Sequence, residues 1–222
     1  MPHTVRIWDL PTRLFHWSLA VTTVALVVTA KLGGNAMQWH LRLGYVMLAL
    51  LAFRLAWGLV GGRWSRFASF LPTPARLRSH FAHQEGKVTS PGHSPLGALS
   101  VFALLAVLLA QVGTGLLSDD EIAFAGPLTR FVSGEWVSQA TWYHKDVGQF
   151  LLLGLVALHL AAIVFYALVR RQALVGPMVH GDRQLPGATP ASRDDALSRA
   201  GAALVAALSA LLAWWVASLG AF

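Results

Sequence analysis

The chain has 222 residues, of which 55% are hydrophobic and only 12% are charged, and its formal net charge is +7. Soluble domains carry roughly 25% charged residues, so the composition is typical of a membrane protein, and Lys and Arg on cytoplasmic loops explain the positive charge better than nucleic-acid binding does. Because the sequence has no cysteine, disulfides, iron–sulfur clusters and covalently attached haem are excluded.

Five windows are long and apolar enough to cross a bilayer, which takes about 20 residues. We expect these spans at residues 14–30, 41–60, 95–117, 144–169 and 200–219. The first could be a signal peptide, but VTAKLGG fits a cleavage site poorly, so we interpret it as a retained span. Between the spans we expect a tight turn at Gly33 and Gly34, a loop at 61–94, an irregular segment at 118–143 and a link at 176–195. The predicted fold is an all-α integral membrane helix bundle.

The distribution of cations predicts the orientation. If the N-terminus is cytoplasmic, twelve Lys and Arg residues lie in inner segments and four in outer ones. The inner set is Arg6, Arg13, Arg63, Arg66, Arg76, Arg78, Lys87, Arg170, Arg171, Arg183, Arg193 and Arg199, and the outer set is Lys31, Arg42, Arg130 and Lys145. By the positive-inside rule, this predicts a cytoplasmic N-terminus and a periplasmic C-terminus.

Four of the nine histidines lie in or at the ends of spans, namely His16, His40, His144 and His159. An ionisable residue inside a bilayer usually has a defined partner, although a single histidine may serve equally well as an interhelical hydrogen bond. In the predicted orientation, His16 and His159 share the inner level, and His40 and His144 share the outer level. His159 follows His144 by 15 residues, about 22 Å along a helix, and can face the same interior.

Two opposed imidazoles on separate helices form the axial ligand set of a haem iron. A zinc site would need three or four ligands at one level, usually including cysteine or a carboxylate. The paired levels therefore predict two non-covalent haems, each bound by two histidines. His93, in the loop-like segment SPGHSPLG at the start of the third span, is a rival ligand, whereas His3, His80, His83 and His180 lie in polar segments and are expected to be solvated.

Glycines and cations accompany these histidines. Gly44 and Gly148 each follow a predicted ligand by four residues on the same helical face, where a flat macrocycle could lie against the backbone; the alternative is that glycine is frequent in membrane helices. Gly113 and Gly115 could serve similarly. The candidate partners of the haem propionates are Arg13, Arg42, Arg54 and Lys145. For Arg13, Arg42 and Lys145, snorkelling of a long cationic side chain at a helix end is an equally good explanation. Arg54 lies further from water, so the propionate role is better supported for it.

Several segments resemble the bacterial cytochrome b-561 family, which includes the b-type cytochrome subunit of nickel–iron hydrogenases. They are VRIWDLPTRLFHWSL, WHLRLGY, FRLAWGLVGGRWSRF, HSPLGAL, YHKDVGQ, LVALHLAA and LVGPMVHG, over about residues 5–185. The resemblance implies four core helices, two b haems, quinone-linked electron transfer at the inner membrane, and the pairs His16–His159 and His40–His144. Residues 1–185 would then form the di-haem domain, and residues 186–222 a linker with a fifth helix that departs from the family pattern.

Irons with two histidine ligands keep no open position for substrate, so we expect an electron carrier without catalytic residues of its own. The expected reaction passes electrons between a quinone or quinol and a periplasmic partner, such as a c-type cytochrome or a hydrogenase. A basic partner could dock on the outer segment 118–143, which begins with the acidic SDDE; the alternative is that this segment is an ordinary solvated loop. The alternatives are a superoxide:quinone oxidoreductase, with Arg42 and Lys145 flanking the outer haem, and a histidine-based metal or proton transporter. The direction of electron flow, the quinone type and the formation of a homo-oligomer stay open.

Overall fold

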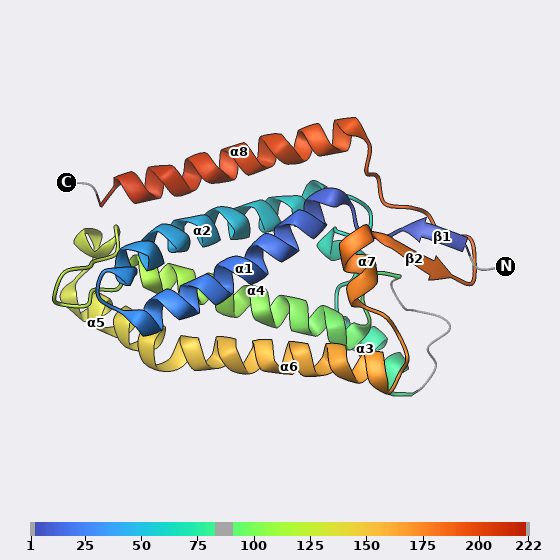
Figure 1. Ribbon diagram of the computed structural model, residues 1–222, viewed down its shortest axis with the longest axis horizontal. Helices are drawn as coiled ribbons and strands as arrows, with labels where there is room; N and C mark the ends of the chain where they lie inside the picture. The colour runs from blue at the N-terminus through green and yellow to red at the C-terminus, as the bar shows by residue number, and fades with distance from the viewer. Residues whose placement is uncertain (1–2, 83–90, 221–222) are drawn as a thin grey trace. The chain divides into compact units, whose positions relative to one another are not determined.

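The computed structural model describes residues 3–82 and 91–220, without the side chains of residues 80 and 81 (Figure 1). His83, Lys87 and the side chain of His80 therefore lie outside the described residues. The long helices are α1 (Leu10–Leu32), α2 (Ala36–Val60), α4 (Pro95–Leu116), α6 (Gln149–Leu168) and α8 (Ala196–Ser218). The short elements are α3 (Pro74–Phe81), α5 (Gly134–Trp142), α7 (Val175–His180), strands β1 (His3–Arg6) and β2 (Asp182–Leu185), and single helical turns at Phe67–Ser69, Thr129–Phe131 and Tyr143–Gly148.

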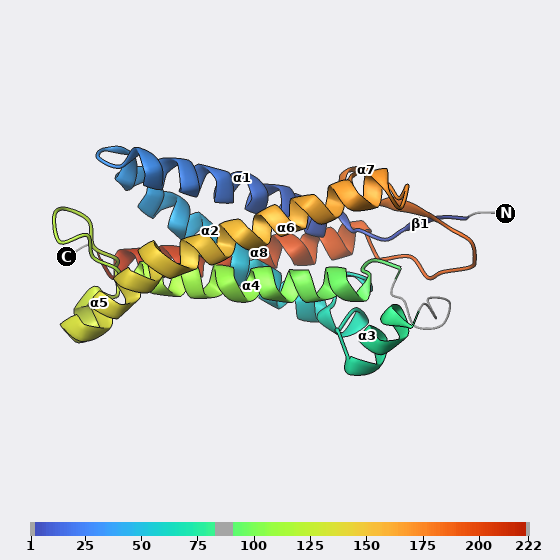
Figure 2. The same cartoon turned by 90° about the horizontal axis from the view of Figure 1, so that it is seen from below.

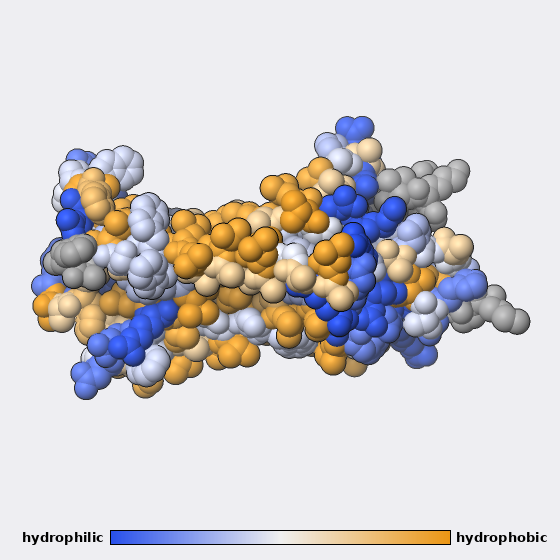
Figure 3. Space-filling model, turned by 90° about the horizontal axis from the view of Figure 1, so that it is seen from above, coloured by the Kyte–Doolittle hydropathy of each residue, from blue (hydrophilic) through white to orange (hydrophobic). Residues whose placement is uncertain are grey.

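Five helices in the described part of the chain are long and apolar enough to cross a membrane, which confirms the predicted fold class. They are Leu10–Leu32, Ala36–Val60, Pro95–Leu116, Gly134–Leu168 and Ala196–Ser218, so four spans begin at or within a few residues of the predicted positions. Many of their large apolar side chains are exposed, including Val21, Leu59, Leu158, Leu204 and Trp214. On the face drawn in Figure 3, hydrophobic surface covers the helices, and hydrophilic side chains gather where α8 begins. Exposed apolar stripes of this kind suit a lipid environment.

The segment predicted to be irregular, 118–143, contains a helix. Helix α5 occupies Gly134–Trp142 and continues through a π turn at Tyr143–Gly148 into α6 (Figure 2). The prediction of irregular structure is therefore wrong for residues 134–142, where Glu, Gln and Ala favour a helix. The π turn also means that the α-helical spacing used above to relate His144 to His159 does not hold throughout the segment.

The predicted link at 176–195 is partly regular. It contains most of α7 and the strand β2, which pairs with β1 in antiparallel register, His3 opposite Leu185 and Arg6 opposite Asp182 (Figure 1). A four-residue strand gives little alternating pattern, and its partner lies more than 170 residues away. For that reason, the sequence pattern did not indicate this pairing.

The chain divides into two compact units. The first, which we call the strand unit, comprises Met1–Leu14, Arg54–Leu104 and Leu155–Ala203. The second, which we call the cavity unit, comprises Phe15–Phe53, Leu105–Gly154 and Leu204–Phe222.

In the strand unit, one buried apolar cluster is built from β1 and the segment that follows it. Val5, Ile7 and Trp8 are buried and pack with Trp64, Met178 and Leu185. The backbone amides of Ile7 and Trp8 both donate to the carbonyl oxygen of Gly181. Gly181 has a φ of +93° and no room for a side chain, so it allows the chain to turn from α7 into β2.

In the cavity unit, α1 and α2 are joined by the predicted tight turn. Gly33 and Gly34 have φ values of +63° and +52°, a conformation that glycine adopts without strain. The larger buried apolar residues of α1, α2, α4 and α6 in this unit are Phe15, Met47, Leu51, Phe53, Leu105, Leu108 and Leu152. They come from α1, α2, α4 and α6, and they hold the segments that carry His40 and His144.

Candidate functional site

Two of the predicted ligands lie close together in the cavity unit. The ring centroids of His40, near the start of α2, and His144, in the π turn, lie 6.1 Å apart with ring planes at 85°. A metal–imidazole bond is about 2 Å long, and a ring centroid lies roughly 1 Å beyond the bonded nitrogen, so two rings on opposite sides of one metal ion have centroids roughly 6 Å apart. The observed spacing fits a single iron between the rings.

Hydrogen bonds fix the orientation of both rings. Nδ1 of His40 lies 3.0 Å from the carbonyl oxygen of Leu26 and 3.4 Å from Oγ1 of Thr29. Nδ1 of His144 lies 2.9 Å from the carbonyl oxygen of Gln111. Because a carbonyl oxygen can only accept, each Nδ1 carries the hydrogen, which leaves the lone pair of each neutral imidazole on Nε2. Metal-binding histidines are typically oriented in this way.

A cavity of about 360 Å³ adjoins the two rings, within the size range of ligand sites. Its lining is mainly apolar and comes from α1, α2, α4 and α6, together with the segment after α4. Gly44 belongs to this lining, and a Cβ built on it would meet no described atom within 4 Å. A flat, mostly apolar group therefore has room beside His40, and the contact of Gly44 with a macrocycle stays a prediction. Lys145 also lines the cavity.

Gly115 and Gln111 are two site residues whose contacts spacing alone did not predict. A Cβ on Gly115 would lie 2.9 Å from Cε1 of His144, so the missing side chain leaves room for the ring. Gln111 contacts His144 through both its backbone and its side chain. The sequence indicates Gly115 only as one of two glycines in the third span that could adjoin a macrocycle. For Gln111, the indication is a glutamine inside an otherwise apolar helix.

Gly148 differs from Gly44. It is buried, and a Cβ on it would collide with the side-chain amide of Gln111 and with the ring of Tyr143. The space beside Gly148 is thus filled by protein, and its predicted contact with a macrocycle stays a prediction. Arg42 lies with its guanidinium 5.0 Å from the ring centroid of Trp39 and is not part of the cavity lining; its role at a propionate likewise stays a prediction.

The other predicted pair is divided between the units. His16 belongs to the cavity unit, where its ring lies edge-on to Trp17 with centroids 5.2 Å apart. His159 belongs to the strand unit and is half-buried on α6. The pairing of these two histidines stays a prediction.

The two inner cations already contact protein groups in the strand unit. Arg54 is only 5% exposed, donates to the carbonyl oxygen of Ser65 at 3.1 Å, and lies 4.4 Å from the ring centroid of Phe67. Arg13 donates to the carbonyl oxygen of Val179 at 2.6 Å. Their roles toward haem propionates stay predictions.

His93, the rival ligand, is buried in the strand unit among aromatic rings. Its centroid lies 4.1 Å from that of Phe70 and 4.8 Å from that of Trp8. Burial, with the nearby charge of Arg54, lowers the pKa of His93 to about 3, so the ring is neutral at physiological pH. Over residues 3–82 and 91–220, no three His, Cys, Asp or Glu side chains group as metal ligands.

Comparison with known proteins identifies the family of the chain. A family model described as prokaryotic cytochrome b561 matches residues 7–181, which include all four predicted ligands. The chain belongs to the prokaryotic cytochrome b561 family. As a member of the cytochrome b561 family, it is a multi-pass membrane cytochrome of the b type that transfers electrons and uses haem b. The match ends before α8 begins.

Similar curated proteins are named as probable Ni/Fe-hydrogenase B-type cytochrome subunits. The one from Bradyrhizobium diazoefficiens is 24% identical over 216 residues, covering 82% of this chain and 86% of the relative. The one from Azotobacter vinelandii is 26% identical over 220 residues, covering 84% and 91%. The one from Rhodobacter capsulatus is 25% identical over 216 residues, covering 81% of each. No solved structure is significantly similar to the chain.

Proposed function

We propose that this cytochrome holds two b haems, each between two histidines, and carries electrons between a quinone or quinol and a redox partner on the periplasmic side. The observation that carries the proposal is the opposed pair His40–His144, with centroids 6.1 Å apart beside a cavity lined mainly by apolar residues. When bound, haem supplies a one-electron couple. With two protein ligands to each iron, no position is left for oxygen or substrate, so the site is suited to electron transfer.

The residues of the outer site have separate roles in this proposal. His40 and His144 would hold the iron through Nε2, while Leu26 and Gln111 fix the tautomers through their carbonyl oxygens. Gly44 provides room for the macrocycle. Lys145, on the cavity wall, is the proposed cation for a propionate. The inner site would use His16 and His159, with Arg13 and Arg54 as the proposed cations.

The proposed orientation places the acidic segment after α4 on the periplasmic side. Backbone amides of Phe124, Ala123 and Ile122 donate to Asp120 and lower the pKa of its carboxyl group. This carboxylate is therefore ionised at neutral pH and would attract a basic partner, such as a c-type cytochrome. The names of the curated relatives make a nickel–iron hydrogenase the other proposed partner.

A superoxide:quinone oxidoreductase is the less favoured alternative. It would need a positive approach to the outer haem, and Lys31 and Lys145 do line the cavity. Asp119 and Asp120 line the same cavity, however, and they offset that charge. The cavity therefore gives no net attraction for an anion, and we retain electron transfer to a protein partner.

Anaerobic reduction by a quinol tests the proposed reaction. The purified protein in lipid nanodiscs is mixed with a ubiquinol or menaquinol analogue, and the reduced haem bands are followed before and after an oxidised c-type cytochrome is added. We expect quinol to reduce the haem and the added cytochrome to reoxidise it. Haem that dithionite reduces but neither quinol reduces would contradict the quinone-linked function.

A further inference from the structure

The π turn that carries His144 is an unusual backbone. Residues Tyr143–Gly148 form i→i+5 hydrogen bonds between the α-helices α5 and α6. Such turns are rare, and they leave backbone carbonyl groups without their normal partners, which must be satisfied if they are buried. The side chains that bind those carbonyls therefore help to decide whether the turn forms.

Two glutamine amides bind carbonyls of this turn. Nε2 of Gln111, on α4, donates to the carbonyl oxygen of His144 at 2.9 Å. Nε2 of Gln149 donates to the carbonyl oxygen of Lys145, and its Oε1 accepts from Nζ of Lys31 at 2.9 Å. Two successive carbonyls of the turn are thus held by side chains from α4 and from the first residue of α6.

Gln111 also holds the ring of the same histidine. Its own carbonyl oxygen accepts from Nδ1 of His144 at 2.9 Å, while its side-chain amide donates to the backbone of His144. One residue thus fixes both the main chain and the imidazole. The donated bond also sets the orientation of the amide, because the opposite orientation would bring two acceptor oxygens together.

Gly148 makes this contact possible. A Cβ at Gly148 would collide with the Oε1 end of the Gln111 amide, and within the described chain Oε1 is buried without a hydrogen-bond partner. The space left by Gly148 therefore admits the side chain of Gln111. In the described chain, the one hydrogen bond made by its amide group goes to the carbonyl oxygen of His144. The unpaired acceptor of Gln111 and the glycine at position 148 both lower the stability of the fold. A positioning role for Gln111 accounts for their presence.

We propose that Gln111, supported by Gln149 and by the space at Gly148, stabilises the π turn and thereby aims His144 at the metal site. The inference rests on the proposed outer haem. Gln111 acts through His144 and is a positioning residue. It deepens the proposed function by assigning the element that sets the orientation of one axial ligand.

The test compares Gln111→Met, which keeps length but removes the donor, with Gln139→Met. Gln139 lies on α5 and donates to the exposed carboxylate of Glu135 at 3.4 Å, so it is a matched control outside the turn. Two measurements are made on the purified protein: hydrogen exchange of peptides covering residues 143–149, and the low-spin haem signals in electron paramagnetic resonance (EPR). If Gln111→Met does not fold, Gln149→Met is used in its place, because it removes the other side-chain contact to a carbonyl of the turn.

We expect exchange in the turn to accelerate roughly tenfold in Gln111→Met and one of two low-spin signals to shift or disappear, with Gln139→Met unchanged in both. Unchanged exchange would overturn the proposal, and so would faster exchange with both signals unaltered. If the unsubstituted protein shows no outer low-spin haem, the proposed function fails. The exchange measurement then still reports whether Gln111 holds the turn.

Discussion

At the scale of single residues, the outer histidines depend on neighbours that their spacing does not reveal. The spacing of His40 and Gly44, and of His144 and Gly148, predicted a site, and the structure does bring the two rings together. The hydrogen bonds to Leu26 and Gln111 involve backbone carbonyls, which any residue type could supply. Only tertiary packing shows which carbonyl each ring reaches, so this part of the site could not be predicted.

Gly115→Ala tests the space beside His144. The added methyl group would lie 2.9 Å from Cε1 of the ring, and the ring or helix α4 must move to relieve this contact. We expect the haem-to-protein ratio to fall by up to one haem per chain, or the outer low-spin signal to shift.

The matched control is Gly113→Ala on the same helix, because Gly113, unlike Gly44, does not line the cavity and a new Cβ there meets no described atom within 4 Å. Gly113→Ala should leave both the ratio and the signal unchanged. If Gly115→Ala behaves like its control, the ring position found here is incorrect.

At the scale of elements, the long apolar helices could be predicted from composition and length alone. Their ends and the short elements could not. The π turn has no hydrophobic signature, because it depends on the amides of Gln111 and Gln149 rather than on periodicity. The β1–β2 pair likewise depends on contacts between segments more than 170 residues apart in the sequence. Leu185 packs against the buried cluster of Val5, Ile7 and Trp8, a contact that strand propensity does not reveal.

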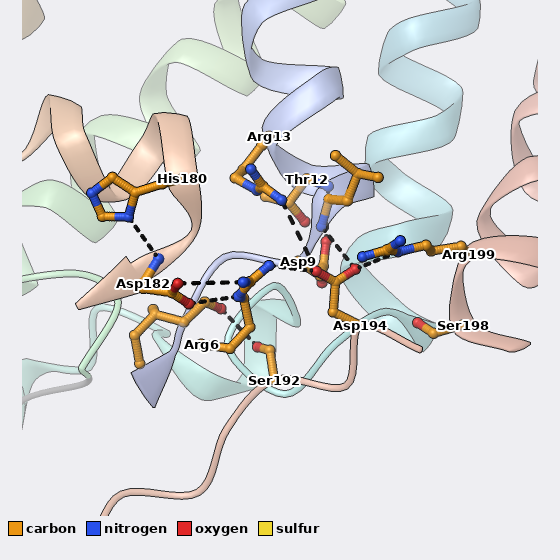
Figure 4. Close-up of polar contacts among 12 residues, drawn as sticks. Arg6, Asp9, Thr12, Arg13, His180, Asp182, Ser192, Asp194, Ser198 and Arg199 are labelled. Atoms are coloured by element: carbon orange, nitrogen blue, oxygen red, sulfur yellow. Dashed lines mark hydrogen bonds and ion pairs between the residues drawn. The ribbon is translucent and has the colours of Figure 1, made fainter. Parts of the chain in front are cut away.

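Helix α8 is anchored through Asp194, which precedes it. This side chain is 7% exposed and accepts from Nη1 of Arg6 at 2.9 Å, Nε of Arg199 at 3.0 Å and the amide of Leu10 at 3.2 Å (Figure 4). Burial raises the pKa of Asp194, but the hydrogen bonds from Arg199, Leu10 and Arg6 outweigh it, and the pKa lies below its usual value. The carboxylate thus ties β1, α1 and the first turn of α8 together in the strand unit.

Asp194→Asn should release the start of α8. Loss of the charged hydrogen bonds should cost roughly 2 kcal/mol of local stability, measured as faster hydrogen exchange in peptides covering residues 190–200. Asp195→Asn is the control, since that carboxylate is 53% exposed and pairs with Arg193, and asparagine can still accept the hydrogen bond from the amide of Ser198.

The same contact gives a pH dependence with a definite sign. Because folding lowers the pKa of Asp194, its contribution is present above the unfolded value of about 4 and is lost as the pH falls through the lower folded value. Exchange in residues 190–200, corrected for its intrinsic pH dependence, should therefore rise below about pH 4 in the natural chain. The rise should be smaller in Asp194→Asn, where the carboxylate of Asp195, whose pKa is also lowered, still titrates in the same segment; equal pH profiles would contradict the anchoring role.

At the scale of the whole molecule, the cation distribution predicts a topology that the absence of cysteine makes easy to test. Ser133 and Gly187 are both exposed and lie in segments assigned to opposite sides of the membrane. In intact cells, Ser133→Cys should react with a membrane-impermeant maleimide that has entered the periplasm. Gly187→Cys should react only after the inner membrane is permeabilised. The reverse pattern would place the N-terminus outside.

The central claim is that opposed histidines bind iron in this cytochrome at two sites, and the haem-to-protein ratio tests it most directly. The ratio is measured by pyridine haemochrome assay, with EPR, on the natural chain and on His144→Ala and His159→Ala. We predict two low-spin haems per chain, and about one in each variant, with a different signal lost in each. A natural chain without low-spin haem, or variants that both retain two haems, would contradict the account.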